Sequence, residues 1–200
     1  MTATLTGLLE RSRQLGFLGP GPVEAHIPHA LAFASASHPD PARALDLGAG
    51  GGLPGLVLAA LVWPATRWTF MDANLRRTDF LREAVEALGL HERVAVITER
   101  AEVVGHDPAH RNAYGLVVAR SFASPAVTAE CAAPLLQVGG QLVVSEPPGG
   151  ELTSRWPVAP LAEIGFGAPE ARVEPVTGDE GLAVHLAVLA LVRPAPARLP

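Results

Sequence analysis

Apolar residues occur along the chain in two patterns, as short nearly continuous runs and as longer segments in which they recur at helical spacing. The short runs predict strands buried on both faces of a parallel sheet, because such runs between helices are typical of α/β proteins. These strands are predicted at residues 43–45, 67–72, 94–97, 116–119, 141–145, 171–176 and 184–193. The longer segments predict helices over 56–62, over 75–88 and from about 124 or 125 to 136.

Turn residues separate these elements and indicate how the sheet ends. Gly89 follows the helix over 75–88 as a C-terminal stop. The turn Gly178-Asp179-Glu180-Gly181 suits a hairpin, so at least one of the last two strands should run antiparallel. The alternation of strands and helices predicts a Rossmann-like, seven-stranded, mostly parallel sheet with helices on both faces.

A glycine-rich turn, Asp-Leu-Gly-Ala-Gly-Gly-Gly-Leu-Pro-Gly over residues 46–55, joins the first predicted strand to the first predicted helix. Such turns hold nucleotide-like cofactors in α/β proteins, because bare backbone can approach the ligand. A dinucleotide fingerprint that starts at Gly48 needs a third small residue where this chain has Leu53, so NAD fits poorly. Asp46 with the glycines gives the D-x-G-x-G-x-G pattern of class I S-adenosylmethionine (SAM) methyltransferases. A tight turn that binds no ligand is the structural alternative.

Asp72 ends the second predicted strand, about 20 residues after the first glycines of the turn. An acidic residue at this place can accept both ribose hydroxyls of an adenosine. The alternative interpretation is a helix N-cap or turn residue, for which Asp is also well suited. The helix that follows presents Arg76, Arg77 and Arg82 on its polar side, which predicts a solvated helix surface.

Length and composition predict one catalytic domain, because 200 residues at 48% hydrophobic can form one sizeable core. The expected boundaries are a helical and linker segment at 1–41, a methyltransferase domain at 42–193 and a flexible tail at 194–200. No apolar stretch is long enough for a bilayer span, and the start of the chain lacks a signal-peptide pattern. Cys131 is expected as a small buried hydrophobe on a helix, and its being the single cysteine favours a reducing cytoplasm.

The charge of the chain restricts how it could bind RNA. The formal net charge is −5, although all 15 basic residues are arginine. A protein that binds nucleic acid regardless of sequence is normally basic, so any RNA site here must be a local patch. Aromatic residues make up 5% of the chain and leave few platforms on which single-stranded bases could stack.

Several segments resemble the RsmG (GidB) family of bacterial 16S ribosomal RNA methyltransferases. The resemblance covers roughly residues 26–146, with a weaker continuation to Arg193. Leu-Pro-Gly directly after the glycine-rich turn and Arg-x-Phe-Ala-Ser after the fourth strand are fairly specific to the family. The matching segments are residues 46–55, Met71-Asp72, Arg76-Arg77, Phe80-Leu81-Arg82, Arg100-Ala101-Glu102-Val103 and Ala119-Arg120-Ser121-Phe122-Ala123-Ser124.

The resemblance implies a class I SAM-dependent methyltransferase fold, SAM as the cofactor and methyl transfer to N7 of a guanine in the decoding-region loop of 16S RNA. It implies a small ribosomal subunit as partner, no metal, no membrane and a monomer in the cytoplasm. Arg120 is implied on the target side, as a catalytic residue that also borders the cofactor; it is placed to bind a phosphate or the guanine O6 edge, or to hold its loop by a salt bridge. The residues implied in cofactor binding are Asp46, Gly48, Gly50, Gly52, Leu53, Asp72, Ala101, Glu102 and Arg120.

The chain also departs from the family pattern. Where the family has Arg-His-x-x-Asp before the first strand, this sequence reads Ala25-His26-Ile27-Pro28-His29. After the fifth strand the family commonly has Lys-Gly, and here Glu146 is expected to repel phosphate. These differences leave two alternatives open: a SAM-dependent methyltransferase that acts on another RNA or a small molecule, and a SAM-binding protein without turnover or an NAD-type oxidoreductase.

Overall fold

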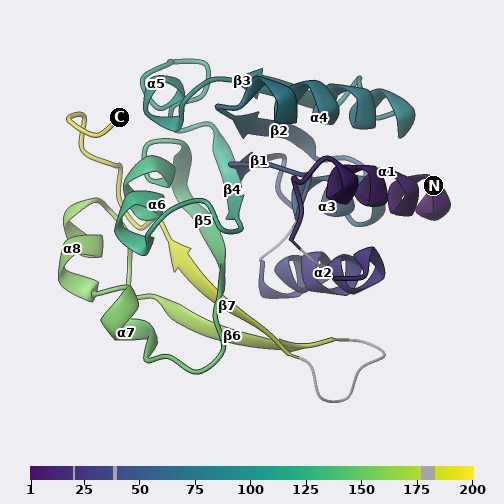
Figure 1. The fold of residues 1–200 in the computed structure, drawn as a ribbon. Coiled ribbons are helices and arrows are strands. Elements are labelled where there is room, and N and C mark those ends of the chain that lie inside the picture. Colours follow the sequence, from purple (N-terminus) through teal and green to yellow (C-terminus); the bar gives the residue numbers. More distant parts are fainter. Residues whose placement is uncertain (20, 38–39, 177–182) are drawn as a thin grey trace.

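The computed structural model describes residues 1–19, 21–37, 40–176 and 183–200 as one α/β domain built on a seven-stranded sheet (Figure 1). The strand order is β3-β2-β1-β4-β5-β7-β6. The strands are β1 (Arg43–Leu47), β2 (Arg67–Asp72), β3 (Val94–Thr98), β4 (Tyr114–Ala119), β5 (Leu136–Glu146), β6 (Glu170–Pro175) and β7 (Ala183–Ala190). The first five are parallel, and β7 runs antiparallel to both β5 and β6. The predicted sheet is confirmed; the turn predicted at 178–181 lies outside the described residues.

Helices cover both faces of this sheet. They are α1 (Thr2–Gln14), η1 (Val23–Ala25), α2 (His26–Ala36), α3 (Gly55–Leu61), α4 (Leu75–Ala87), α5 (Ala101–Val104), α6 (Pro125–Ala132), α7 (Leu152–Arg155) and α8 (Val158–Glu163). The predicted helix over 75–88 is confirmed as α4, whose N-cap Asn74 accepts a hydrogen bond from the Arg77 backbone N–H. Among the described residues, none of the helices has the length and apolar character needed to cross a bilayer.

Successive residues of the central strands point to opposite faces of the sheet and build two hydrophobic cores. Leu116 and Val118 of β4 belong to a cluster that also contains buried residues of α1, α2, α3 and α4. Val117 and Ala119 of the same strand belong to the other cluster, together with residues of α5, α6 and α8. Cys131 is buried in this second core on α6, which confirms the prediction of a small buried hydrophobe on a helix.

The largest difference from a predicted boundary lies between the end of α6 and the start of β5. The helix expected to reach residue 136 ends at Ala132, and Leu136 already begins β5, where it pairs with Tyr114 of β4. Pro134 explains the difference, because its ring blocks the helical hydrogen bond and clashes with the preceding turn. The apolar residues that follow are therefore core residues at the start of the strand.

Both ends of the chain make specific contacts with the domain. The segment expected as a linker contains α2, whose Phe33 is fully buried and which packs on α3, β6 and β7. The segment expected as a flexible tail runs back toward α5 (Figure 1), and Arg111 donates hydrogen bonds to the carbonyls of Pro196 at 3.1 Å and Leu199 at 3.2 Å. The Leu199 side chain is buried in the second core.

Candidate active site

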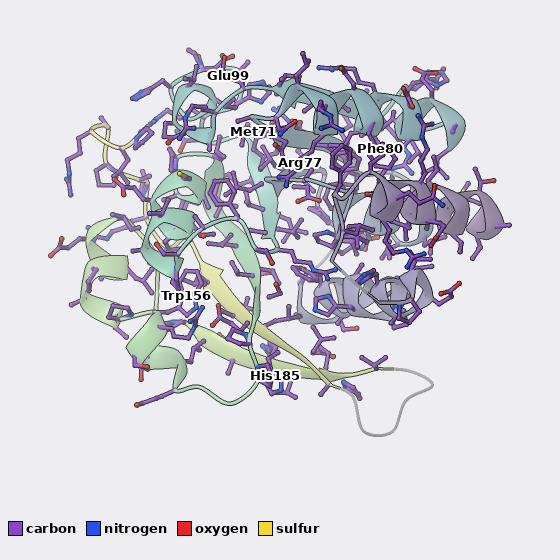
Figure 2. The ribbon with its side chains drawn as sticks, in the orientation of Figure 1. Met71, Arg77, Phe80, Glu99, Trp156 and His185 are labelled. Atoms are coloured by element: carbon purple, nitrogen blue, oxygen red, sulfur yellow. The ribbon has the colours of Figure 1, made fainter. Side chains whose placement is uncertain are left out.

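A cavity of about 290 Å³ lies at the carboxyl ends of β1, β2, β3 and β4, near the lower end of the size range of small-molecule sites. Parallel strands bring their following loops to one edge of the sheet, and the order changes direction between β1 and β4, where α/β proteins bind ligands. Met71, Arg77 and Glu99 mark this cavity in Figure 2. Of the residues predicted to bind cofactor, the cavity is lined by Gly48, Asp72, Ala101 and Glu102.

Asp72 is held in place by the backbones of two neighbouring loops. Its Oδ2 accepts a hydrogen bond from the Gly50 N–H at 3.0 Å, and its Oδ1 accepts one from the Asn74 N–H at 2.8 Å. The N-cap interpretation of Asp72 is therefore wrong, because Asn74 caps α4, whereas the turn role is present. Each carboxylate oxygen can accept a further hydrogen bond, so the fixed carboxylate still has acceptor capacity toward the cavity.

The glycine-rich turn needs its glycines for two separate reasons. A Cβ at Gly48 would lie 2.5 Å from Cδ2 of Phe122, so a side chain there would displace a ring that lines the cavity. Gly50 has a φ of +52°, a conformation that disfavours side chains, and from it donates to Asp72. The turn thus presents backbone to the cavity and fixes the acidic residue at the end of β2.

Three other predicted residues lie behind the turn and do not line the cavity. Asp46 is fully buried, and its Oδ2 accepts a hydrogen bond from the Gly55 N–H at 2.7 Å at the start of α3. Burial raises the pKa of the Asp46 carboxyl to about 7. Leu53 is buried in the first core, and a Cβ at Gly52 would meet Leu56. These residues shape and support the turn.

Arg77 is a cavity residue that the sequence predicted to be part of a solvated surface. Its Nη1 lies 3.5 Å from Asp72 Oδ2, and it lines the cavity from the first turn of α4. The neighbouring Arg76 instead lies over the Phe17 ring, with its guanidinium carbon 5.9 Å from the centroid. The sequence signal that could have identified Arg77 is its place in the first turn of the helix that directly follows the predicted ribose-binding carboxylate.

Ala101 and Glu102 border the cavity from the start of α5, as predicted. The Glu102 side chain is engaged by Arg100, whose Nη2 donates to Oε1 at 3.0 Å. A hydrogen bond from the Glu102 backbone N–H, together with the one from Arg100, lowers the pKa of the Glu102 carboxyl. Because Arg100 engages the Glu102 side chain, the backbone at the start of α5 forms this side of the first cavity.

A second cavity of about 380 Å³ adjoins the first and shares Ser121, Phe122 and Ala123 with it. Its other walls come from α2, α6, β5 and α7, and Trp156, which also lines it, is labelled in Figure 2. Ser121 has a φ of +54°, so the shared wall includes a residue in the left-handed region. Two cavities that meet at the same three residues can hold a donor and an acceptor next to each other.

Arg120 lines the second cavity and not the first. Its Nη2 lies 3.4 Å from His26 Nδ1, and its Nη1 is buried without a hydrogen-bond partner in the part of the chain that the structure describes. Burial lowers the pKa of its guanidinium, and the nearby Asp46 opposes that change. Within residues 1–19, 21–37, 40–176 and 183–200, no salt bridge joins Arg120 to a carboxylate, so the loop-holding alternative is wrong.

Glu146 does not present the free negative charge that the sequence predicted. Its Oε2 accepts a hydrogen bond from Arg155 Nε at 2.5 Å, and its Oε1 accepts one from Trp156 Nε1 at 3.1 Å. The Glu146 side chain is only 8% exposed. The expectation that this residue repels phosphate is therefore wrong, because α7 supplies the cation that neutralises it.

A known protein family matches the part of the chain that contains most of the residues lining both cavities. The GidB family model, described as rRNA small subunit methyltransferase G, matches residues 22–146. Proteins named ribosomal RNA small subunit methyltransferase G are similar over much of the chain. One from Roseiflexus castenholzii is 36% identical over 80% of this chain and 67% of its own length. Another, from Chloroflexus aggregans, is 33% identical over 89% of this chain and 73% of its own length.

Solved structures of methyltransferases share the fold at low sequence identity. An O-methyltransferase from Bacillus cereus in complex with SAH has a TM-score of 0.64 at 16% identity, covering 94% of this chain and 90% of that one. A SAM-dependent O-methyltransferase from Thermotoga maritima has a TM-score of 0.61 at 14% identity, covering 94% of this chain and 72% of that one. The family match and the shared fold together show that the chain belongs to the GidB family of SAM-dependent rRNA small subunit methyltransferases.

Proposed function

We propose that the chain transfers a methyl group from SAM to N7 of a guanine in 16S ribosomal RNA. The observation that carries this proposal is the pair of adjoining cavities that share the Ser121–Ala123 wall. A transferase of this kind must hold the cofactor and the target base side by side, and the family match supports ribosomal RNA of the small subunit as the target.

In the first cavity, we assign the ribose of SAM to Asp72 and the adenine to the backbone at Ala101 and Glu102. The paired backbone N–H groups of Gly50 and Asn74 hold the Asp72 carboxylate, which favours hydrogen bonds to two neighbouring hydroxyls. Gly48 lets the methionine part approach the turn, and Arg77 borders the same space. We assign Asp46, Gly52 and Leu53 to the support of this turn.

In the second cavity, we assign Arg120 to the RNA. Guanine N7 carries an exposed lone pair, so the reaction needs no base to remove a proton before attack. SAM would supply the electrophilic methyl group, and the protein would act by aligning N7 with it, an orientation effect worth several kcal/mol. Arg120 is suited to this role because its guanidinium is fixed in the wall beside the shared segment and lacks a carboxylate partner among the described residues.

The charge pattern is compatible with RNA as the substrate. The net charge is −5, yet the second cavity brings Arg120 and Arg155 together with one acid, Glu146, whose charge Arg155 offsets. This local positive excess is the kind of patch that an acidic protein needs to bind RNA. We expect the chain to act as a monomer on the small ribosomal subunit in the cytoplasm, with the cofactor cavity formed within residues 42–193 and α2 contributing to the second cavity.

The test is methyl transfer from radiolabelled SAM to 30S subunits, naked 16S RNA and a small-molecule extract. The proposal predicts label in 16S RNA and RNA cleavage at one guanine after borohydride and aniline treatment, which detects N7-methylguanine. Label only in the extract would instead support another acceptor. Binding of SAM without transfer to any of the three would support a binding protein without turnover.

A further inference from the structure

Four buried polar atoms without hydrogen-bond partners among the described residues come from neighbouring side chains of one cluster. They are His26 Nε2, His29 Nδ1, Asp46 Oδ1 and Arg120 Nη1. Arg120 Nη2 lies 3.4 Å from His26 Nδ1, and the charge of Arg120 acts on both histidines and on Asp46. Buried polar groups in proteins nearly always have partners, so a cluster of this kind needs a specific explanation.

The cluster carries an excess of positive charge. Burial lowers the pKa of His29 to about 4, with further lowering from Arg120 and His26, so the imidazole is neutral near pH 7. Asp46, whose charge acts on Arg120, has its pKa raised to about 7 by burial and so is only partly charged at neutral pH. A cation next to two neutral imidazoles and a partly protonated acid favours an anionic ligand.

His29 and Arg120 both line the second cavity, so an anion there could reach them together. Glu146 lines the same cavity, but its two carboxylate oxygens accept hydrogen bonds from Arg155 and Trp156. The Glu146 carboxylate therefore does not engage the hydrogen-bond donors of His29 and Arg120. Arginine suits phosphate because its planar guanidinium can donate two parallel hydrogen bonds, and a neutral imidazole can donate one more.

We propose that His29 and Arg120 form a phosphate-binding subsite that holds the phosphate of the nucleotide to be methylated. This inference rests on the proposed function, since it takes RNA as the substrate. A phosphate held there would place the attached base beside Ser121–Ala123, the segment that also lines the cofactor cavity. His29 thereby becomes a positioning residue for the target base.

The experiment compares guanosine 5′-monophosphate, guanosine and adenosine 5′-monophosphate by calorimetry, with the protein saturated with the demethylated product of SAM. The subsite predicts that guanosine 5′-monophosphate binds at least tenfold more tightly than guanosine. Adenosine 5′-monophosphate should keep part of that gain, because the phosphate contributes independently of the base. Equal affinity for guanosine 5′-monophosphate and guanosine would overturn the proposal.

Two variants of His29 assign the effect to the subsite. His29→Asp places a carboxylate beside Arg120 and should abolish the preference for the phosphorylated ligand, whereas His29→Leu removes only the imidazole donor and should weaken it several-fold. His106→Asp is the matched control, because His106 is exposed and precedes β4, whereas Arg120 follows that strand. Circular dichroism checks that each variant folds. A preference that survives both His29 substitutions in folded protein would overturn the subsite.

Methyl transfer to 30S subunits, measured in parallel, separates the two proposals. If the wild-type chain methylates 16S RNA but shows no preference for the phosphate, the subsite fails and the proposed function stands. If the preference depends on His29 but RNA accepts no methyl group, the phosphate subsite stands as a binding site and the proposed function fails.

Discussion

The two cavities differ in how their polar groups are satisfied. In the first, Asp72 accepts hydrogen bonds from Gly50 and Asn74, and Arg77 lies beside it. In the second, Arg120 and His29 each keep a buried nitrogen without a hydrogen-bond partner among the described residues. A preorganised acceptor suits a cofactor of constant structure, whereas free donors suit an anionic ligand that arrives with each turnover. This difference supports the proposed assignment of the first cavity to the cofactor and the second to the RNA.

The largest expected effect concerns Asp46, the buried acid near Arg120. Its pKa is raised to about 7 in the folded protein, above the value of about 3.9 expected in the unfolded chain. The folded state then binds more protons between about pH 4 and 7, so the stability from this group is present below pH 4 and is lost as pH rises to 7. The slope should approach 1.4 kcal/mol per pH unit.

Asp46→Asn should remove this slope, since an amide oxygen can still accept from the Gly55 N–H. The measurement is urea unfolding of both proteins from pH 4 to 8. Their difference isolates Asp46 from His29, whose lowered pKa contributes stability with the opposite pH dependence. Asp79→Asn, at an exposed position of α4, controls for the loss of one acidic group. Parallel curves for wild type and Asp46→Asn would contradict a raised pKa.

Asp72→Ala tests the preorganised side of the comparison. Loss of two hydrogen bonds to a charged acceptor, each worth about 1.5 kcal/mol, should weaken SAM binding about 100-fold. Calorimetric titration with SAM measures this loss. Asp79→Ala, the same substitution at an exposed position, should bind like the wild type. Unchanged affinity in folded Asp72→Ala protein would refute the ribose assignment.

Glu146→Lys tests whether the acid of the second cavity is free or paired. A lysine would lose the bonds to Arg155 and Trp156 and set two cations against each other. Because Arg155 is 40% exposed and partly screened, we expect a loss of about 2 kcal/mol in the free energy of unfolding. Glu163→Lys, at an exposed position of α8, should change stability little in the same thermal or urea unfolding. A stable Glu146→Lys protein with tighter RNA binding would show that the acid acts as a free charge.

Gly48→Ala should have the smallest effect of this set, about a tenfold loss of SAM affinity. The new Cβ would meet Phe122 at 2.5 Å and shift a ring that lines the cofactor cavity. Gly89→Ala is a matched control, because Gly89 has a similar positive φ of 66° but nothing within 4 Å of its Cβ position. The control should lose stability without losing affinity. Equal SAM affinity in both variants would show that Gly48 does not contribute to cofactor binding.

The sequence could predict features that depend on local pattern. The apolar runs predicted the strands, and the glycine spacing after Asp46 distinguished a methyltransferase turn from a dinucleotide turn. Arg77 and Glu146 were misjudged because their partners, Asp72 and Arg155, become neighbours only through tertiary packing. An arginine on a helix and an acid after a strand look solvated until the opposing element is known.

The cluster around Arg120 shows the same limit more strongly. His29 belongs to α2, an element within the segment expected as a linker, and it meets Arg120 across the sheet edge. The sequence marked this position only as a departure from the family pattern. Which groups face Arg120 could not be inferred from spacing, since strands β1 to β4 lie between His29 and Arg120 in the sequence.

The most direct test of the division between the cavities is Arg120→Ala, measured both by calorimetric SAM binding and by single-turnover methyl transfer to 30S subunits. Arg120 lines the second cavity alone, so SAM affinity should stay within about twofold of wild type. Transfer should fall about 100-fold at saturating SAM, because misalignment of the acceptor carries a cost of that order. A fall in SAM affinity as large as the fall in transfer would place Arg120 in the cofactor site and contradict the two-cavity account.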